Sequence, residues 1–208
     1  MLKLFFSIIT ICIIFSGNLV SQSVDKDEVY KKLVDKYGKM KSVSFKFSSP
    51  ESKILQGSLI AVKGNKYLID TKDRDVYCNG KTIWNHTISD NDVLISVFEP
   101  SNTSPMSLES FFFNFLEQYQ ANDLTESTSS LGTKSLVLNL IPKGEKTFDI
   151  DDMKIWLDQK NYVIKSVKMK IAGKIQTLNI EDLVIDKSYP DKTFEYVPSG
   201  NEKIIDFR

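Results

Sequence analysis

The sequence predicts a mainly β domain of the α+β class, in which a curved antiparallel sheet is covered on its open side by about two helices. Short segments with alternating apolar and polar residues recur along the chain, as is typical of half-buried strands. Gly, Asn, Asp and Ser cluster between these segments, where turns are expected. No long helical pattern separates successive strands, which excludes a parallel sheet built of βαβ units.

The first 23 residues predict a cleaved secretory signal peptide. Lys3 is their only charge, and ten of the twelve residues from Leu4 to Phe15 are apolar. Crossing a bilayer takes about 20 apolar residues, so the length favours a signal over the alternative, a retained N-terminal anchor. We expect cleavage after Ser21 or Ser23 and a single domain over residues 24–208.

Cysteine content bears on the compartment. Cys12 lies in the predicted signal, so Cys78 would be the only cysteine of the exported chain and no intrachain disulfide could form. An exported chain without disulfides fits a bacterial periplasm. We expect Cys78 to be a buried, inert thiol in a strand.

The domain begins with an amphipathic helix over residues 27–38. Its apolar stripe carries Val29, Leu33 and Tyr37, and charged residues fill the other face. Gly38 stands where the helix should end. The apolar stripe must therefore pack against the sheet.

Six strands are predicted next, where the period changes to two. The first has Phe45 and Phe47 on one face and Ser44 and Lys46 on the other. Asn79-Gly80 is a favoured pair for a tight hairpin turn. The predicted strands cover residues 43–48, 57–62, 66–70, 75–78, 82–86 and 93–98.

A second helix is predicted over residues 106–119, started by Ser104-Pro105. It is apolar on more than one stripe, so it must be covered on two sides or bind an apolar ligand. The polar segment 120–133 predicts a surface connection. The remaining strands are predicted at residues 135–141, 153–157, 162–171 and 174–185, with a last edge strand at 204–205.

Composition excludes several kinds of function. Lys and Arg number 27, and so do Asp and Glu, so no basic excess is available to hold a nucleic acid. One histidine and two cysteines are too few for most zinc sites, and we expect neither a metal nor another cofactor. His86 is the only imidazole that could act as a general base, and no Gly-x-Ser-x-Gly segment exists. We therefore expect a binding protein, not an enzyme, and no catalytic residue.

Several short motifs, in their order and spacing, resemble those of the LolA-like proteins, the periplasmic carriers of outer-membrane lipoproteins. The resemblance covers almost the whole chain after the predicted signal. Each motif is weak alone, and the set is specific only together with the predicted signal and an apolar helix led by proline. The motifs are Val43-Ser44-Phe45-Lys46-Phe47, Gly57-Ser58-Leu59, Cys78-Asn79-Gly80-Lys81-Thr82-Ile83-Trp84, Leu140-Ile141-Pro142-Lys143 and Phe194-Glu195-Tyr196-Val197-Pro198-Ser199-Gly200.

The resemblance implies an incomplete antiparallel β-barrel closed by helices, with a cavity for the acyl chains of a lipoprotein. It implies that an inner-membrane ABC transporter of the lipoprotein-releasing type hands over acylated lipoproteins, and that an outer-membrane receptor takes them. It also implies a periplasmic monomer.

Nine apolar residues are predicted to line this cavity and its aromatic lid. A slip of one residue in a strand would send the opposite set inward. Lys63-Gly64 stands where the family usually has Arg-Pro, and we assign Lys63 to the gate, because lysine keeps the charge although it lacks the bidentate fork of arginine. The nine residues are Phe45, Phe47, Leu59, Tyr67, Trp84, Phe98, Phe111, Phe112 and Phe115.

Three alternatives stay open at this stage. Two remain binding functions: a carrier of free lipid or glycolipid, and an envelope-stress sensor that detects stray lipoproteins. An apolar cavity contacts acyl chains and not head groups, so the sequence does not distinguish these binding functions from one another. The third is a hydrolase of an envelope lipid, which requires His86 to face the cavity.

Overall fold

The computed structural model describes residues 24–99, 108–128, 134–144, 150–171 and 173–208. The predicted signal peptide, residues 1–23, and the predicted helix start at Ser104-Pro105 lie outside the described residues. Within the described ranges, no helix has the length and apolar content needed to span a membrane.

The described residues form twelve strands in one sheet, and their spatial order is β12-β6-β5-β4-β3-β2-β1-β11-β10-β9-β8-β7. Neighbouring strands are antiparallel, as predicted, except that β12 runs parallel to β6. The strands are β1 (Ser42–Ser49), β2 (Ser52–Val62), β3 (Lys66–Thr71), β4 (Arg74–Asn79), β5 (Thr82–Thr87), β6 (Asp92–Val97), β7 (Tyr119–Thr128), β8 (Lys134–Pro142), β9 (Ile150–Asp158), β10 (Ile164–Ile171), β11 (Lys174–Ile185) and β12 (Lys203–Asp206).

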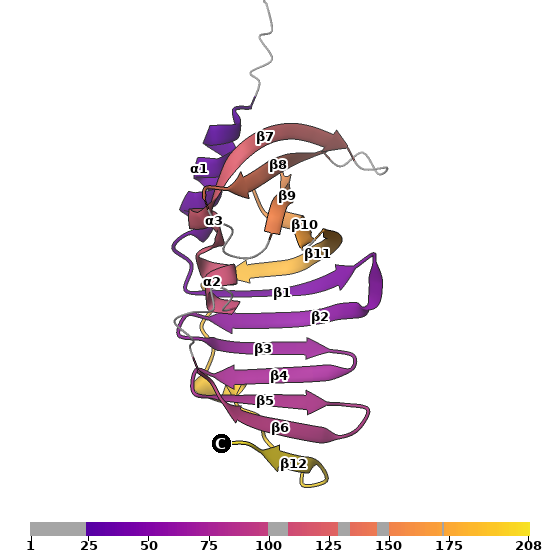
Figure 1. Ribbon diagram of the computed structural model, residues 1–208. Helices are drawn as coiled ribbons and strands as arrows, with labels where there is room; N and C mark the ends of the chain where they lie inside the picture. Colours follow the sequence, from indigo (N-terminus) through magenta and orange to yellow (C-terminus); the bar gives the residue numbers. More distant parts are fainter. Residues whose placement is uncertain (1–23, 100–107, 129–133, 145–149, 172) are drawn as a thin grey trace, which may run out of the picture.

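The sheet is open and strongly curved, which confirms the predicted fold class. Figure 1 shows β7 to β11 curling over at one end, while β1 to β6 continue as a flatter ladder. The helices α1 (Lys26–Tyr37), α2 (Leu108–Phe113) and α3 (Phe115–Gln118) lie along one side of the curled part. The curled strands and the helices together form an incomplete barrel.

Helix α1 forms for the reasons that the sequence predicts. Asp25 caps it, because its carboxylate accepts hydrogen bonds from the amides of Asp27 and Glu28. Val29 and Leu33 are fully buried against the sheet, and so hold the helix in place.

Cross-strand pairs define two faces of the ladder. Phe45 of β1 pairs with Leu59, and Leu59 pairs with Ile69 of β3, so these side chains share the inner, concave face. At Gly57 the strands β2 and β3 approach so closely that a Cβ would lie 2.0 Å from the carbonyl oxygen of Asp70. Only glycine fits there, which explains the first residue of the Gly-Ser-Leu motif.

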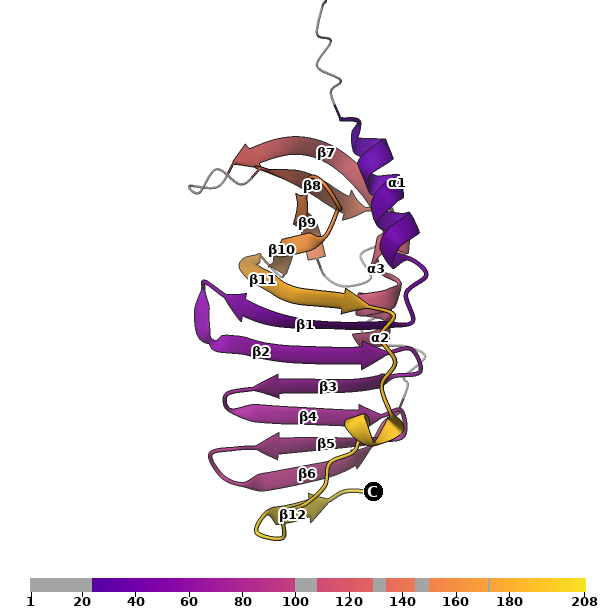
Figure 2. The same cartoon turned by 180° about the vertical axis from the view of Figure 1, so that it is seen from behind.

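The C-terminal segment covers the outer face. After β11 the chain runs down past the ends of β1 and β2 to the short helix η1 (Asp191–Phe194), which packs on β3 and β4 (Figure 2). Tyr196 then places its ring 5.5 Å from that of Tyr77. The segment ends in β12, the edge strand predicted at residues 204–205.

Two predictions about the middle of the chain are wrong. The segment predicted as a surface connection contains β7, whose polar side chains suit an edge strand and conceal its period. The helix predicted over residues 106–119 is broken at Asn114 into α2 and α3, and the chain is already extended at Tyr119. The break is at Asn114, whose φ of −124° and ψ of −1° depart from the helical values.

Helix α1 also secures the start of the edge strand β7. The Tyr30 hydroxyl lies within hydrogen-bond distance of the carbonyl oxygens of Leu116 and Tyr119, the latter at 2.7 Å. A hydroxyl has one hydrogen to donate, so the two carbonyls share it. These contacts join α1 to the end of α3 and to β7.

We predict that Tyr30→Phe lowers the free energy of unfolding by about 1–2 kcal/mol, because it leaves both carbonyls without this donor. Urea denaturation followed by circular dichroism measures the change. The matched control is Tyr162→Phe, which removes a hydroxyl that accepts only an exposed contact from Lys32 and should cost less than about 0.5 kcal/mol. Equal stability of Tyr30→Phe and the wild type would contradict the role of this contact.

Candidate functional site

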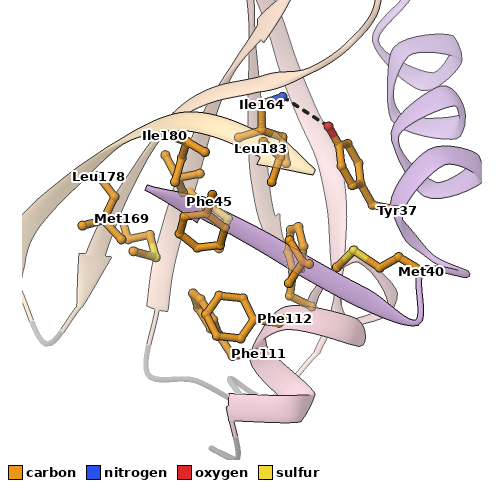
Figure 3. Close-up of a pocket in the computed structure, with 14 residues that line it drawn as sticks. Tyr37, Met40, Phe45, Phe111, Phe112, Ile164, Met169, Leu178, Ile180 and Leu183 are labelled. Carbon is orange, nitrogen blue, oxygen red and sulfur yellow. Dashed lines mark hydrogen bonds between the residues drawn. The ribbon is translucent and has the colours of Figure 1, made fainter. Parts of the chain in front are cut away.

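An apolar cavity lies inside the curl of the sheet, between β1, β9, β10, β11 and the helices (Figure 3). Its volume is about 90 Å³. The lining residues are Tyr37, Met40, Val43, Phe45, Phe111, Phe112, Phe115, Met153, Ile164, Val167, Met169, Leu178, Ile180 and Leu183.

Strand alternation places most of this lining. Val167 and Met169 on β10, and Leu178 and Ile180 on β11, recur at period two and therefore face the same side. A bulge opposite β1 then inserts Asp182, with φ of 52°, into β11. Because the bulge adds one residue, Leu183 also reaches the cavity despite its odd spacing from Ile180.

The break between α2 and α3 divides the aromatic residues. Phe111, Phe112 and Phe115 face the cavity, whereas Phe113 and Leu116 are buried in the surrounding core. The Phe112 ring makes an edge contact with Phe45 at 6.0 Å between centroids, and with Phe111 at 5.2 Å. Residues 108–118, which we call the lid, therefore close one side of the cavity with aromatic rings.

The cavity offers almost no polar group to a ligand. Among the described residues of the lining, Tyr37 has the only hydroxyl. This group is already paired: it accepts from the amide of Ile164 (Figure 3) and donates to the carbonyl of Tyr162, both at 3.3 Å. Burial raises the pKa of Tyr37, so it stays neutral. Three methionines add flexible side chains that adapt to an irregular apolar shape. Such a lining suits an apolar chain of variable shape.

A carboxylate from the lid is tied to the turn between β2 and β3. Glu109 Oε2 accepts hydrogen bonds from the backbone amides of Gly64, at 3.0 Å, and Asn65, at 2.5 Å. Gly64 and Asn65 have φ of 97° and 60°, a turn conformation that presents consecutive amides to an anion. Lys63, in the same turn, places its Nζ 5.8 Å from the centroid of the Phe113 ring.

The tie therefore runs from an acidic side chain of the lid to backbone amides. Lys63 contacts the lid through Phe113, and its assignment to the gate stays a prediction. Nothing in the sequence marked Glu109 in advance, because its partners are main-chain groups of a distant turn.

Of the nine predicted lining residues, the structure brings four together at the cavity: Phe45, Phe111, Phe112 and Phe115. Phe47, Leu59, Tyr67 and Phe98 belong to the hydrophobic core around it without lining it. Whether any of them contacts a ligand stays a prediction.

The placement of Trp84 is corrected. It pairs with Tyr77 of β4 and Ile95 of β6 on the outer face, the face covered by Tyr196. Its neighbour Ile83 faces inward instead, opposite Cys78. The prediction put Trp84 on the wrong face, because a shift of one residue exchanges the two faces of a strand.

Sequence reasoning missed ten of the lining residues, most of them on β9, β10 and β11. Their strands were predicted, and the period-two pattern of residues 164–171 and 174–180 marked an apolar face. The missing information was that β11 lies beside β1, which only the tertiary fold supplies.

The side chains that could act in catalysis lie away from the cavity. His86 is on the outer face, where its Nδ1 is 3.5 Å from Asp75 Oδ2 and its ring lies 5.4 Å from Tyr196. It therefore cannot act as a base on a substrate in the cavity, which removes the basis of the hydrolase alternative. Cys78 is fully buried and its pKa is raised by that burial, as expected for an inert thiol. No cluster of three potential metal ligands occurs within the part of the chain that the structure describes.

A comparison with known protein families identifies the family of this chain. The family model described as outer membrane lipoprotein carrier protein LolA matches residues 19–173. The chain belongs to the LolA family. The match includes the helices and strands from α1 to β10, and thus most of the cavity lining.

Individual relatives are distant. An uncharacterized protein of Methanocaldococcus jannaschii is 24% identical over 200 residues, which cover 93% of this chain and 57% of that protein, so the chain spans little more than half of it. A solved structure of an uncharacterized conserved protein from Thermus thermophilus is similar with a TM-score of 0.51 at 10% identity, covering 86% of this chain and 98% of the other. The Mycobacterium tuberculosis lipoprotein LppX has a TM-score of 0.48 at 11% identity, covering 79% of this chain and 97% of that one. The Thermus likeness supports the fold alone.

We predict that Glu109→Ala loosens the lid. Hydrogen bonds to a charged group contribute about 1.5–3 kcal/mol, so amide hydrogen exchange in residues 109–118 should become about 10–100 times faster. Hydrogen exchange read by mass spectrometry measures this. The control is Glu117→Ala, an exposed acidic residue of α3, which should leave exchange unchanged. Unaltered protection in Glu109→Ala would show that the tie does not hold the lid.

Proposed function

We propose that this protein is a periplasmic carrier that binds the acyl chains of lipoproteins released from the inner membrane and delivers them to the outer membrane. It acts by binding and not by catalysis. The observation that carries the proposal is the apolar cavity closed by the aromatic lid. The family match, described as a carrier of outer-membrane lipoproteins, supports the choice of cargo.

The energetics favour an acyl chain as ligand. Removing apolar surface from water contributes about 0.8 kcal/mol per methylene, so a chain of about a dozen methylenes gains roughly 10 kcal/mol on burial. The lining supplies this without directional contacts, since its one hydroxyl is already paired inside the protein. Affinity would therefore depend on apolar area and not on head-group identity.

The cavity must widen to take its cargo. Its volume of about 90 Å³ is below the roughly 300–1,000 Å³ of typical ligand pockets. An acyl chain enters only if Phe111 and Phe112 move outward with the lid, and the methionines repack around it. The closing of the cavity after departure of the chain would restore buried apolar contacts and so help release.

The proposed partners follow from this role. An inner-membrane ABC transporter of the lipoprotein-releasing type would load the carrier with acylated lipoproteins. An outer-membrane receptor would unload it. We propose that the carrier works as a monomer, which binds one lipoprotein at a time.

A second candidate in the same class is a carrier of free lipid or glycolipid. The observation that favours it is the apolar lining itself, which would contact acyl chains and has no free polar group to select the protein part of a lipoprotein. A sensor of stray lipoproteins would use the same cavity.

We expect the purified protein, added to spheroplasts that hold newly made lipoproteins, to release them as a soluble one-to-one complex. Phe112→Asp should abolish release and the binding of a fluorescent fatty acid, because it places a carboxylate against the Phe45 and Phe111 rings. The control is the same substitution at Phe207, whose side chain is 67% exposed. Circular dichroism checks that both variants fold.

Each outcome separates the candidates. Fatty-acid binding without lipoprotein release would favour the free-lipid carrier. A folded Phe112→Asp variant that binds and releases like the wild type would contradict a role for the lid and cavity. If the wild type binds neither cargo nor probe, the aromatic lid serves only as core.

A further inference from the structure

A hollow lined by three lysines lies where α1 passes into β1. The segments that form it are the start of β1, the end of β2 and the chain that follows β11, which runs past both strands (Figure 2). The residues that line it are Lys39, Lys41, Ser42, Val62, Asp186, Lys187, Ser188 and Tyr189. We call Lys39, Lys41 and Lys187 the lysine cluster.

Hydrogen bonds that involve the main chain fix the two segments that carry the cluster. The Ser42 hydroxyl donates to the carbonyl of Lys187 at 2.7 Å, and the Asp186 amide donates to the carbonyl of Ser42 at 3.0 Å. The amide of Lys41 donates to Asp186 Oδ1 at 2.7 Å. The lysines therefore project from a backbone that is fixed by long-range hydrogen bonds.

The charge of the cluster is not neutralised within the described part of the chain. All three lysines are exposed, and none forms an ion pair with a described residue. Asp186 is the one carboxylate among the described residues that line the hollow, so positive charge stays in excess there. By contrast, nearby Lys66 is paired with Asp191 at 2.7 Å. The Lys187 Nζ lies 5.3 Å from the centroid of the Tyr189 ring, a cation–π contact that keeps the positive charge. The cluster thus presents three cationic groups at the hollow.

The cluster adjoins the apolar cavity. Met40, between Lys39 and Lys41, lines that cavity, and Val43 lines it directly after Ser42 of the hollow. The segment 39–43 therefore has lysines on one side and cavity-lining side chains on the other. A partner that meets this segment therefore meets cationic groups on the same stretch of chain that lines the apolar cavity.

We infer that the lysine cluster docks the protein on the anionic surface of a lipid bilayer, with the lysines against lipid phosphates. The inference rests on the proposed carrier function. A bilayer is the partner that presents phosphates and acyl chains together, and the cluster and the cavity are adjacent on segment 39–43. The full chain carries 27 basic and 27 acidic residues, so attraction would depend on this local cluster and stay weak enough for the carrier to leave.

Sedimentation with vesicles tests the inference. The wild type is mixed with vesicles of phosphatidylcholine alone and of phosphatidylcholine with phosphatidylglycerol, at low and high salt. We expect binding only to the anionic vesicles, reduced by salt because the attraction is electrostatic. Each lysine near such a surface contributes about 1 kcal/mol, so the triple variant Lys39→Gln, Lys41→Gln, Lys187→Gln should partition about 100 times less.

A matched triple variant controls for the lost charge. Lys53→Gln, Lys72→Gln, Lys174→Gln removes three exposed lysines at the opposite ends of the strands and should bind anionic vesicles like the wild type. The inference would be overturned if both triple variants lost vesicle binding equally. It would also be overturned if the wild type bound vesicles with and without anionic lipid equally well.

Binding of a fluorescent fatty acid in solution, measured on the same samples, separates this inference from the proposed function. A cluster variant that keeps fatty-acid binding and loses vesicle binding supports both. A wild type that binds the fatty acid but not anionic vesicles overturns the docking surface and leaves the carrier function standing. A wild type that binds anionic vesicles through the cluster but takes no fatty acid overturns the carrier function instead.

Discussion

The pairing of β1 with β11 is the contact on which the site depends. The sheet consists of two meanders, β1 to β6 and β7 to β11, in which strands that follow one another in sequence are neighbours in space. In the part of the chain that the structure describes, the β1–β11 ladder is the only strand pairing that joins them, with Phe47 opposite Ile180 across more than 100 residues of chain. The cavity takes its lining from both meanders, so it forms only when this ladder is in register.

Two irregularities shape the surroundings of the cavity. The bulge at Asp182 adds a residue to β11, so that Leu183 turns inward and joins the apolar lining. The break at Asn114 leaves the lid as two short helices, held partly by the hydrogen bonds of Glu109 to the turn between β2 and β3. A short, tethered lid can open at modest cost, which a carrier requires.

Much of the fold could be predicted from the sequence alone, because strands with one buried and one exposed face alternate apolar and polar residues. The strands β1 to β6 and β8 to β12 were predicted from apolar alternation and turn residues, although β2 begins at Ser52 and β9 at Ile150, earlier than predicted. Strand β7 could not be found, since an edge strand with few apolar residues loses that signal. The site was predicted less well: the aromatic lid is conspicuous in composition, but the face of Trp84 depends on a parity that the sequence does not fix. The β11 lining depends on a pairing between distant segments, which local patterns do not encode.

The central claim is that an acyl chain occupies the cavity between β1, β9 to β11 and the lid. The most direct measurement is photolabelling with a fatty acid that carries a diazirine near the end of its chain, followed by mass spectrometry of the labelled peptides. The account predicts labels concentrated in the lid, residues 108–118, and on β10 and β11, residues 164–183, with competition by unlabelled fatty acid. Labels that fall on the outer face around Tyr77 and Trp84, or that spread over the surface without competition, would contradict it.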